Sequence, residues 1–277
     1  MSDAQKIARV FPRRTKATPK DELAFVGPPP LLCLPEIDEV HVSVAFTWDL
    51  PEAERLARAW ELVGVPVKLG GPAYKKPGGA FVPGLYLEKG YVITSRGCDR
   101  HCWFCGVPER EGGVVRELPI TDGHNVLDDN LLACSQGHIL AVFMMLAEQS
   151  RRPEFTGGLE AARLKPWHAE LLRKVKSRRI YMAYDTPDDL EPLRVAGKIL
   201  TEAGFTRAAH HLGCYCLIGY RGDTFALAEK RLRETWDAGF VPYAMLYKGE
   251  SGETDITWRR FQREWLRPQI VAAKMGG

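Results

Sequence analysis

Three cysteines lie close together in residues 97–105, and their type and spacing point directly to metal chemistry. Cys98 and Cys102 are separated by three residues, and Cys102 and Cys105 by two. Thiolates at such spacing can converge on one metal centre. Three ligands leave one position of a tetrahedral zinc site or a four-iron cluster open, unless a fourth ligand comes from elsewhere. The sequence therefore predicts either a reactive metal centre or a zinc knuckle on this segment.

The same spacing, with the aromatic Phe104 directly before the last cysteine, resembles the cluster motif of the radical S-adenosylmethionine (SAM) superfamily. The resemblance implies that Cys98, Cys102 and Cys105 hold three irons of a [4Fe–4S] cluster. It implies that SAM chelates the fourth iron and that Phe104 lies near the adenine. It further implies reductive cleavage of SAM to a 5′-deoxyadenosyl radical that abstracts hydrogen from a substrate, with electrons from a flavodoxin or ferredoxin type of donor.

Composition limits the class of protein. The 277 residues are 45% hydrophobic and 26% charged, with a net charge of +3, as in ordinary globular proteins. No apolar run approaches the roughly 20 residues of a membrane span, and the first residues lack a signal-peptide core. The other four cysteines, Cys33, Cys134, Cys214 and Cys216, are scattered, which argues against a disulfide framework. We therefore expect a cytoplasmic protein with no membrane partner.

Changes in composition divide the chain into four expected segments. Residues 1–37 are rich in Lys, Arg and Pro and predict an extended arm. Residues 38–88 predict a small β-α-β unit, with strands at 39–47 and 65–69 around a helix at 51–63. Residues 89–250 form the main domain, and residues 251–277 a basic, aromatic helix.

The small β-α-β unit resembles a truncated form of the cobalamin-binding domain that precedes the catalytic domain in some radical SAM enzymes. It lacks the Asp-x-His-x-x-Gly sequence that supplies a histidine to cobalt. It is also far shorter than a complete five-stranded domain. These two differences predict that cobalamin binding is unlikely and that the unit only covers one edge of the main domain.

Strands and helices alternate through the main domain. The expected strands are 91–95, 124–128, 154–158, 180–185, 214–220 and 241–247. Helices are expected at 137–149, 166–176, 186–204 and 223–239. Such alternation predicts an α/β fold with a parallel sheet, closed or partly closed as a barrel. The partial (β/α)6 TIM-like barrel is the fold of the radical SAM superfamily, and its active sites lie at the carboxyl ends of the strands.

Acidic residues follow the second expected strand. Asp128, Asp129 and Asn130 stand where the family has a Gly-Gly-Glu-like segment that meets the amino group of SAM, and they resemble the iron–sulfur oxidoreductase and cobalamin-linked branch. The alternatives are a helix cap and turn for the two aspartates, or an alignment of Glu160, after Gly157 and Gly158, with the family glutamate. We expect Asp128 and Asp129 to meet the amino group of SAM.

Two further strand ends are candidates for SAM binding. Asp185, after the fourth strand, either contacts the ribose or belongs to the first turn of the next helix beside Thr186. Ile218 and Gly219, after the fifth strand, resemble the family segment whose backbone packs on adenine.

The substrate side has several polar candidates near the expected barrel mouth: Glu160, Arg163, Tyr184, His210, His211 and Tyr247. Cys214 and Cys216 share one face of a strand. They are either buried small residues, ligands of a second cluster, or a thiol that quenches a radical. The catalytic candidates are Glu160, Tyr184 and Cys216.

The uneven distribution of basic residues along the sequence suggests two other functions. The basic arm and the Arg259–Arg267 region, with Trp258, Phe261 and Trp265 interleaved, suit phosphates and bases. They favour a radical SAM enzyme that modifies tRNA or DNA bases, or a non-catalytic iron–sulfur or zinc protein that binds nucleic acid. The alternative is a solvated arm and an amphipathic closing helix. The primary expectation is a radical SAM enzyme acting on an unidentified substrate.

Overall fold

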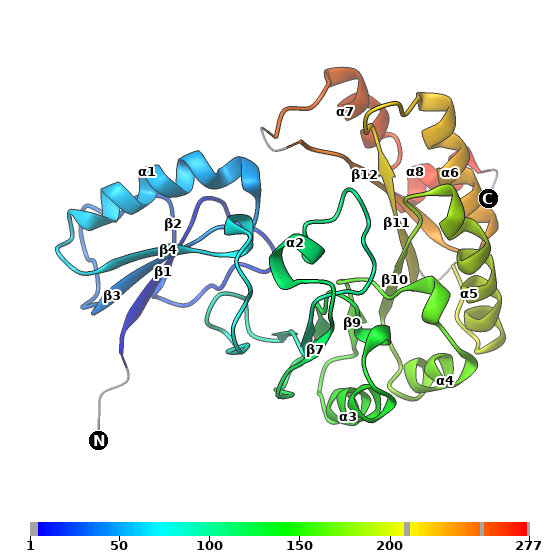
Figure 1. Cartoon of the computed structure of the whole chain (residues 1–277), viewed down its shortest axis with the longest axis horizontal. Helices are drawn as coiled ribbons and strands as arrows, with labels where there is room; N and C mark the ends of the chain where they lie inside the picture. The colour runs from blue at the N-terminus through cyan, green and yellow to red at the C-terminus, as the bar shows by residue number, and fades with distance from the viewer. Residues whose placement is uncertain (1–4, 208–210, 250–251, 276–277) are drawn as a thin grey trace. The chain divides into compact units, whose positions relative to one another are not determined.

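The computed structural model describes residues 5–207, 211–249 and 252–275 (Figure 1). Two units divide the chain: Met1–Tyr91 with Gly97–Val114, and Val92–Arg96 with Val115–Gly277. Each unit has its own parallel sheet. The cysteine loop belongs to the first unit, although the residues immediately before it belong to the second.

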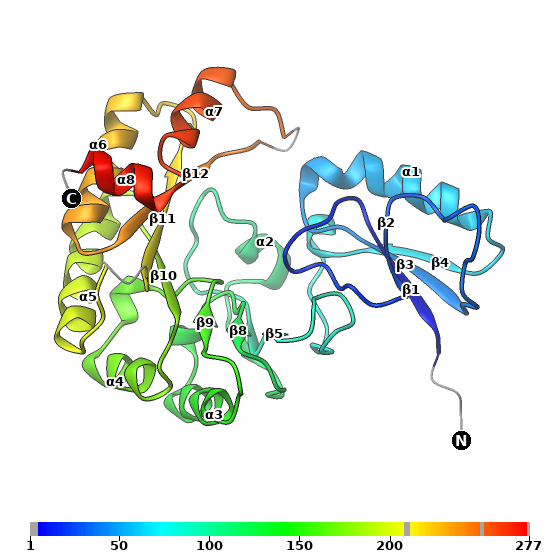
Figure 2. The same ribbon diagram turned by 180° about the vertical axis from the view of Figure 1, so that it is seen from behind.

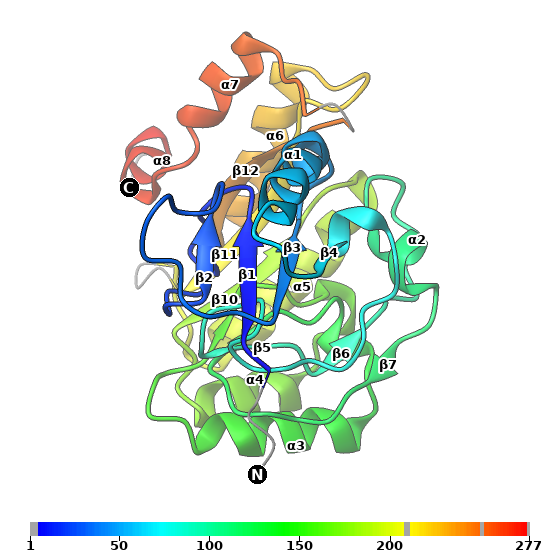
Figure 3. The same ribbon diagram turned by 90° about the vertical axis from the view of Figure 1, so that its left-hand side faces the viewer.

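The first unit has a four-stranded parallel sheet. Its strands are β1 (Ile7–Phe11), β2 (Ala24–Val26), β3 (Glu39–Ser43) and β4 (Val67–Gly70). They lie in the order β2-β1-β3-β4 (Figure 3). The short helices of this unit are η1 (Thr47–Asp49), η2 (Pro72–Tyr74) and α2 (Val107–Glu111).

The amino-terminal segment corrects one expectation. Residues 5–37 are not an extended arm, because β1 and β2 are half of the sheet, so a boundary at residue 37 would cut through it. Ala8 and Val10 are fully buried. Three of the six cations in residues 1–20 that suggested a solvated arm are paired: Lys6 with Glu36 (2.9 Å), Arg9 with Asp21, and Arg13 with Asp49. Paired charges flanking a five-residue strand hide its apolar pattern in the sequence.

Helix α1 (Leu50–Glu61) covers one face of this sheet. Its Leu56 and Trp60 are fully buried against Val40 and Val42 of β3. The Trp60 indole N–H also donates to the Gly27 carbonyl (3.1 Å), which ties the helix to the chain after β2. Strand β3, helix α1 and strand β4 follow the expected β-α-β order.

The second unit contains a six-stranded sheet in the order β12-β11-β10-β9-β8-β5. The strands are β5 (Tyr91–Val92), β8 (Asn125–Val126), β9 (Glu154–Phe155), β10 (Arg179–Ala183), β11 (Leu212–Ile218) and β12 (Val241–Leu246). The pairings from β8 to β12 are parallel. Strands β6 (Ser95–Arg96) and β7 (Arg116–Glu117) form a separate antiparallel pair. The strand expected at 91–95 is therefore divided between two sheets.

Helices follow the strands of this sheet along one side of it (Figure 2). They are α3 (Gln136–Ala147), α4 (Pro166–Lys174), α5 (Leu190–Glu202) and α6 (Phe225–Asp237), with short helices η3 (Leu131–Ala133), η4 (Ala161–Arg163) and η5 (Pro187–Asp189). Ser135 and Thr224 cap α3 and α6, each accepting a backbone N–H at 3.2 Å. Among the described residues, no helix is long and apolar enough to cross a membrane.

Two helices close the chain instead of the one expected. They are α7 (Ile256–Arg263) and α8 (Pro268–Lys274), and a proline in the first turn begins the second. Phe261 stacks on Phe225 of α6 (centroids 5.3 Å), Trp258 packs against the same ring at a tilt (4.4 Å), and Trp265 is buried. The aromatic side chains therefore face the protein, as in the amphipathic alternative.

Candidate functional site

The three motif cysteines lie on a loop that begins directly after β6. Cys98, Cys102 and Cys105 are half-buried, and the Cys105 N–H donates to the Cys102 carbonyl (3.0 Å) in a tight turn. The Arg100 N–H donates to Cys98 Sγ (3.4 Å). Within the described chain, no three His, Cys, Asp or Glu side chains are arranged as a metal site. The donor set still suits iron, because these thiols are accessible and a backbone N–H to sulfur is a contact that tunes clusters.

Contacts inside the first unit anchor this loop. Glu111, buried in α2, accepts the Gly78 N–H (3.1 and 3.2 Å to its two oxygens) and the Arg110 Nε–H (2.9 Å). A Cβ at Gly113 would lie 2.9 Å from His101 Cε1, so a side chain there would displace the His101 ring. Phe104 is half-buried, with its ring edge-on to Trp103 (5.3 Å).

Asp128 contacts the segment that leads into the cysteine loop. Its carboxylate accepts the Thr94 N–H (2.6 Å), the Thr94 hydroxyl (2.6 Å) and the Ser95 hydroxyl (2.7 Å). The side chain is buried, and burial raises its pKa. Because these contacts use both oxygens, the described geometry differs from the expected contact with the SAM amino group: Asp128 anchors the chain at Thr94 and Ser95.

Two expected site residues come together beyond β8 and β9. The Asn130 Nδ2–H donates to Glu160 Oε2 (2.7 Å), and the same oxygen accepts the Arg163 Nε–H (2.6 Å). A Cβ at Gly157 would lie 2.9 Å from the backbone after β8, so glycine permits this close approach. Asn130 is buried and Asp129 is half-buried. The family-like Asn and the alternative Glu160 thus belong to one polar cluster.

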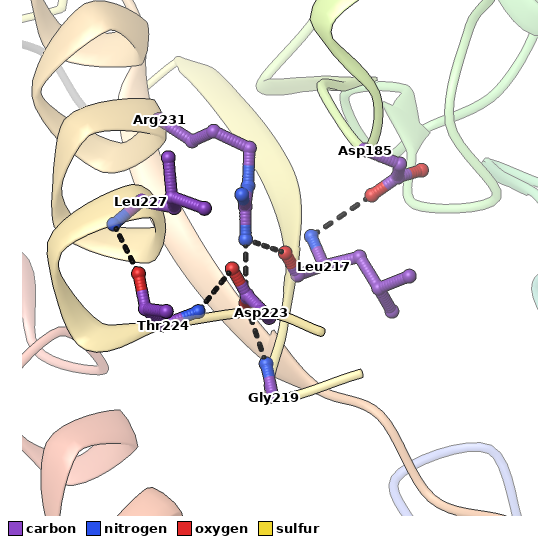
Figure 4. A network of polar contacts seen from close by, with 7 residues as sticks. All are labelled: Asp185, Leu217, Gly219, Asp223, Thr224, Leu227 and Arg231. Atoms are coloured by element: carbon purple, nitrogen blue, oxygen red, sulfur yellow. Dashed lines mark hydrogen bonds and ion pairs between the residues drawn. The ribbon is translucent and has the colours of Figure 1, made fainter. Parts of the chain in front are cut away.

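Where β10 ends, the side chain of Asp185 replaces the strand as hydrogen-bond partner of the β11 backbone. The Tyr184 N–H donates to the Tyr215 carbonyl (2.8 Å), and the next N–H on that side of β11, Leu217, donates to Asp185 Oδ1 (2.9 Å; Figure 4). Thr186 and Asp189 form the capping box of the following helix, so the capping role belongs to Asp189 rather than Asp185.

The environment of Asp185 raises its pKa to about 6, mainly through burial and also through the nearby Asp189. The Leu217 hydrogen bond and Arg231 oppose this shift. Among the described residues, Asp185 Oδ2 has no hydrogen-bond donor. One oxygen is therefore fixed and the other is available to a ligand hydroxyl.

The adjacent end of β11 has a specific backbone shape. Ile218 is fully buried, and its carbonyl accepts the Tyr247 N–H (2.8 Å). Gly219 has a φ of 71°, and its N–H donates to Asp223 Oδ2 (2.8 Å). A Cβ there would lie 2.6 Å from Leu246 Cδ1, so the strand end requires glycine.

Two catalytic candidates face away from the expected barrel mouth, which corrects their assignment. The buried Tyr184 donates its hydroxyl to Glu234 Oε2 of α6 (2.7 Å). Cys216 Sγ lies 3.1 Å from the Thr235 hydroxyl, also on α6. Side chains alternate along a strand, and this face of β10 and β11 packs on helices. Burial raises the pKa of the Cys214 thiol well above its ordinary value, and the Cys216 side chain is also fully buried. Both cysteines therefore fit the alternative of buried small residues.

The opposite face of the sheet carries residues that sequence analysis missed. Tyr181 and Tyr215 stack (centroids 4.6 Å), and Tyr243 meets Tyr215 edge-on (6.1 Å). The Tyr215 hydroxyl donates to the Thr156 carbonyl (3.0 Å). The signal was the alternation in these three strands, in which tyrosines occupy the positions between the residues that face the helices. His210, an expected substrate residue, lies outside the described residues.

Replacing Asp128 with Ala should lower the free energy of unfolding by about 3 kcal/mol, because three buried donors lose their acceptor. Urea unfolding followed by circular dichroism measures this. The control is Asp188→Ala, at an exposed position, with a change of about 0.5 kcal/mol or less. Equal effects of the two substitutions would contradict the anchoring role.

Comparisons with known proteins agree with this arrangement at the level of fold. No family model and no curated protein matches the sequence. A solved structure that is similar to the chain is the radical SAM methyltransferase TsrM from Kitasatospora setae, with cobalamin and a [4Fe–4S] cluster bound. The TM-score is 0.56 at 12% identity, over 88% of this chain and 75% of that one. The chain therefore has a radical SAM-like fold.

Proposed function

We propose that this protein is a radical SAM enzyme, in which Cys98, Cys102 and Cys105 hold a [4Fe–4S] cluster. The observation that carries the proposal is the three-cysteine loop directly after β6, in a chain whose fold is similar to that of a radical SAM enzyme. When bound, such a cluster supplies the electron that cleaves SAM and starts hydrogen abstraction from a substrate. A flavodoxin or ferredoxin type of donor would reduce it.

The residues of the second unit that we assign to SAM lie at strand ends. Asp185 Oδ2 would accept a ribose hydroxyl, since Oδ1 is held by Leu217. The backbone at Ile218 and Gly219 would pack on the adenine. The cluster of Asn130 and Glu160 offers an oxygen acceptor to the amino group, in place of Asp128.

A small-molecule substrate fits better than a nucleic acid. Three of the six amino-terminal cations that suggested a nucleic-acid surface, Lys6, Arg9 and Arg13, form ion pairs with Glu36, Asp21 and Asp49. The aromatic residues of α7 pack on Phe225 and are not presented for base stacking. Both arguments for a tRNA- or DNA-modifying enzyme, and for a non-catalytic nucleic-acid-binding protein, are thereby weakened.

Anaerobically reconstituted protein with dithionite and SAM should release 5′-deoxyadenosine. Cys98→Ala, Cys102→Ala and Cys105→Ala should each reduce the release at least about 100-fold, because each removes a thiolate ligand. Chromatography of the quenched reaction measures the product. Cys33→Ala is the matched control, since Cys33 is exposed and outside the motif, and it should behave as the wild type. Release that survives all three motif substitutions would contradict the proposal.

SAM affinity should fall as the pH drops through the pKa of Asp185, about 6. The acceptor of the ribose hydroxyl is the ionised carboxylate of Asp185. Because the pKa of Asp185 is raised to about 6, the carboxylate is protonated below that pH and the acceptor is lost. Between pH 7.5 and 5.5 the dissociation constant should rise about fourfold, as measured by equilibrium dialysis. Asp185→Asn should bind more weakly at high pH and show a flat profile. A wild-type profile that is equally flat would remove Asp185 from the site.

Cobalamin use is a second candidate. TsrM is described with cobalamin bound, and our expectation against cobalamin used the short β-α-β unit and the missing histidine motif. The first unit has four strands rather than the two expected, which weakens the first of these arguments. The connections after β1 and β3 lead in opposite directions across the sheet, and such switch points bind ligands in open parallel sheets.

Aromatic and cationic side chains meet after these two strands. Phe46 and Trp48 stack at 4.8 Å, and Arg13 lies over the Phe46 ring at 6.0 Å. A flat ring system suits the stacked aromatic surface.

Purified protein incubated with hydroxocobalamin and desalted should retain about one equivalent, read from its visible spectrum. Trp48→Ala should reduce retention about tenfold by removing half of the aromatic pair. Trp167→Ala, in α4 of the second unit, is the control and should retain as much as the wild type. No retention by the wild type would support the original expectation against cobalamin.

A further inference from the structure

We propose that Arg231 is a positioning residue for SAM: together with Asp223 it holds the end of β11 in the shape that the cofactor requires. This inference rests on the proposed radical SAM function. Neither residue was among the expected site residues. Both belong to the α6 region, Asp223 directly before its Thr224 cap and Arg231 within the helix.

Two hydrogen bonds join these two residues to the strand end, and a third joins them to each other (Figure 4). Arg231 Nη2 donates to the Leu217 carbonyl (3.0 Å) and to Asp223 Oδ2 (2.7 Å). The same Asp223 oxygen accepts the Gly219 N–H (2.8 Å). The side chains of Arg231 and Asp223 are only 8% and 0% exposed, so the pair is shielded from water. The carbonyl of Leu217 and the N–H of Gly219 are thus fixed through one ion pair.

The position of this ion pair matters because β10 has already ended there. The N–H and C=O of Leu217 face the side of β10, since the Tyr215 carbonyl on that side accepts the Tyr184 N–H. Asp185 takes the N–H of Leu217, and Arg231 takes its C=O. Two side chains from different elements therefore replace a strand. A change at Arg231 would reach the Asp185 carboxylate through one residue, Leu217, whose two flanking peptide groups the two side chains hold.

Stability alone is a poor reason to bury this ion pair. Taking two charges out of water costs about as much as their attraction returns, and well-packed apolar residues stabilise a fold equally well. A charged pair does give directional bonds to two peptide groups of the segment assigned to adenine. Arg233, two residues later, makes the opposite case: it is half-exposed and pairs with Glu229 on the helix surface (2.6 Å).

The test compares Arg231→Met, Arg231→Lys and Arg233→Met in full-length, reconstituted protein. Arg231→Met should weaken SAM binding at least about tenfold, because a charge-assisted bond and its partner are lost. Iron content per chain should stay at the wild-type level. Arg231→Lys should recover part of the affinity, since one ammonium donor can reach one of the two acceptors. Arg233→Met should bind SAM as the wild type does.

The pH profile of SAM binding gives a readout that a merely structural residue would not move. Asp185 is faced by Asp189 from η5 and by Arg231 from α6. Loss of the Arg231 cation should shift the midpoint of the profile to higher pH, and Arg231→Lys should restore it. If Arg231→Met does not fold, Arg231→Lys decides the question by weaker binding at an unchanged melting temperature.

The outcomes separate the two proposals. Wild-type affinity and an unshifted profile in a folded Arg231 variant would overturn the positioning role while the radical SAM function stands. A wild-type protein that binds no SAM would overturn the function, and the positioning role with it.

Discussion

Backbone groups at the carboxyl ends of parallel strands must find partners where the neighbouring strand has already turned away. In the second unit side chains supply those partners. Asp128 accepts the Thr94 N–H, Asp185 the Leu217 N–H and Asp223 the Gly219 N–H, while Arg231 donates to the Leu217 carbonyl. The same edge of a parallel sheet is where ligands bind. A carboxylate at such a strand end can therefore bond to the backbone, to a ligand or to both. An oxygen that accepts no hydrogen bond from the protein is the one that can bind a ligand.

This explains how far sequence analysis reached. Strand–helix alternation predicted the segments of the six-stranded sheet and placed acidic residues at the strand ends. It did not predict which acids retain a free oxygen, because that depends on where each neighbouring strand stops. The sequence also led us to expect Tyr184 and Cys216 near the barrel mouth, on the face of the sheet that the helices do not cover. Side chains alternate with a period of two, so an error of one position transfers a residue to the helix-covered face.

Strands β1 and β2 of the amino-terminal sheet were not predicted from the sequence, for a different reason. Strand β1 has five residues, with the paired Arg9 among them and further charges on both sides, so composition outweighed pattern. The partners Asp21, Glu36 and Asp49 are 12 to 36 residues away in sequence. Long-range ion pairing of this kind leaves no local signal. Its recognition changes the chemistry under consideration, because a four-stranded parallel sheet has a switch point and a single β-α-β unit has none.

The fold and the three-cysteine motif support the proposed radical SAM function independently of each other. At 12% identity a structural likeness concerns the path of the backbone and says nothing of particular side chains. The three cysteines are the reverse, because their spacing was read without any knowledge of the fold. They follow β6 within two residues, and Asp128 fixes the residues just before them. A chance cysteine cluster has no reason to occur at this place in a radical SAM-like fold, and this coincidence carries more weight than either observation alone.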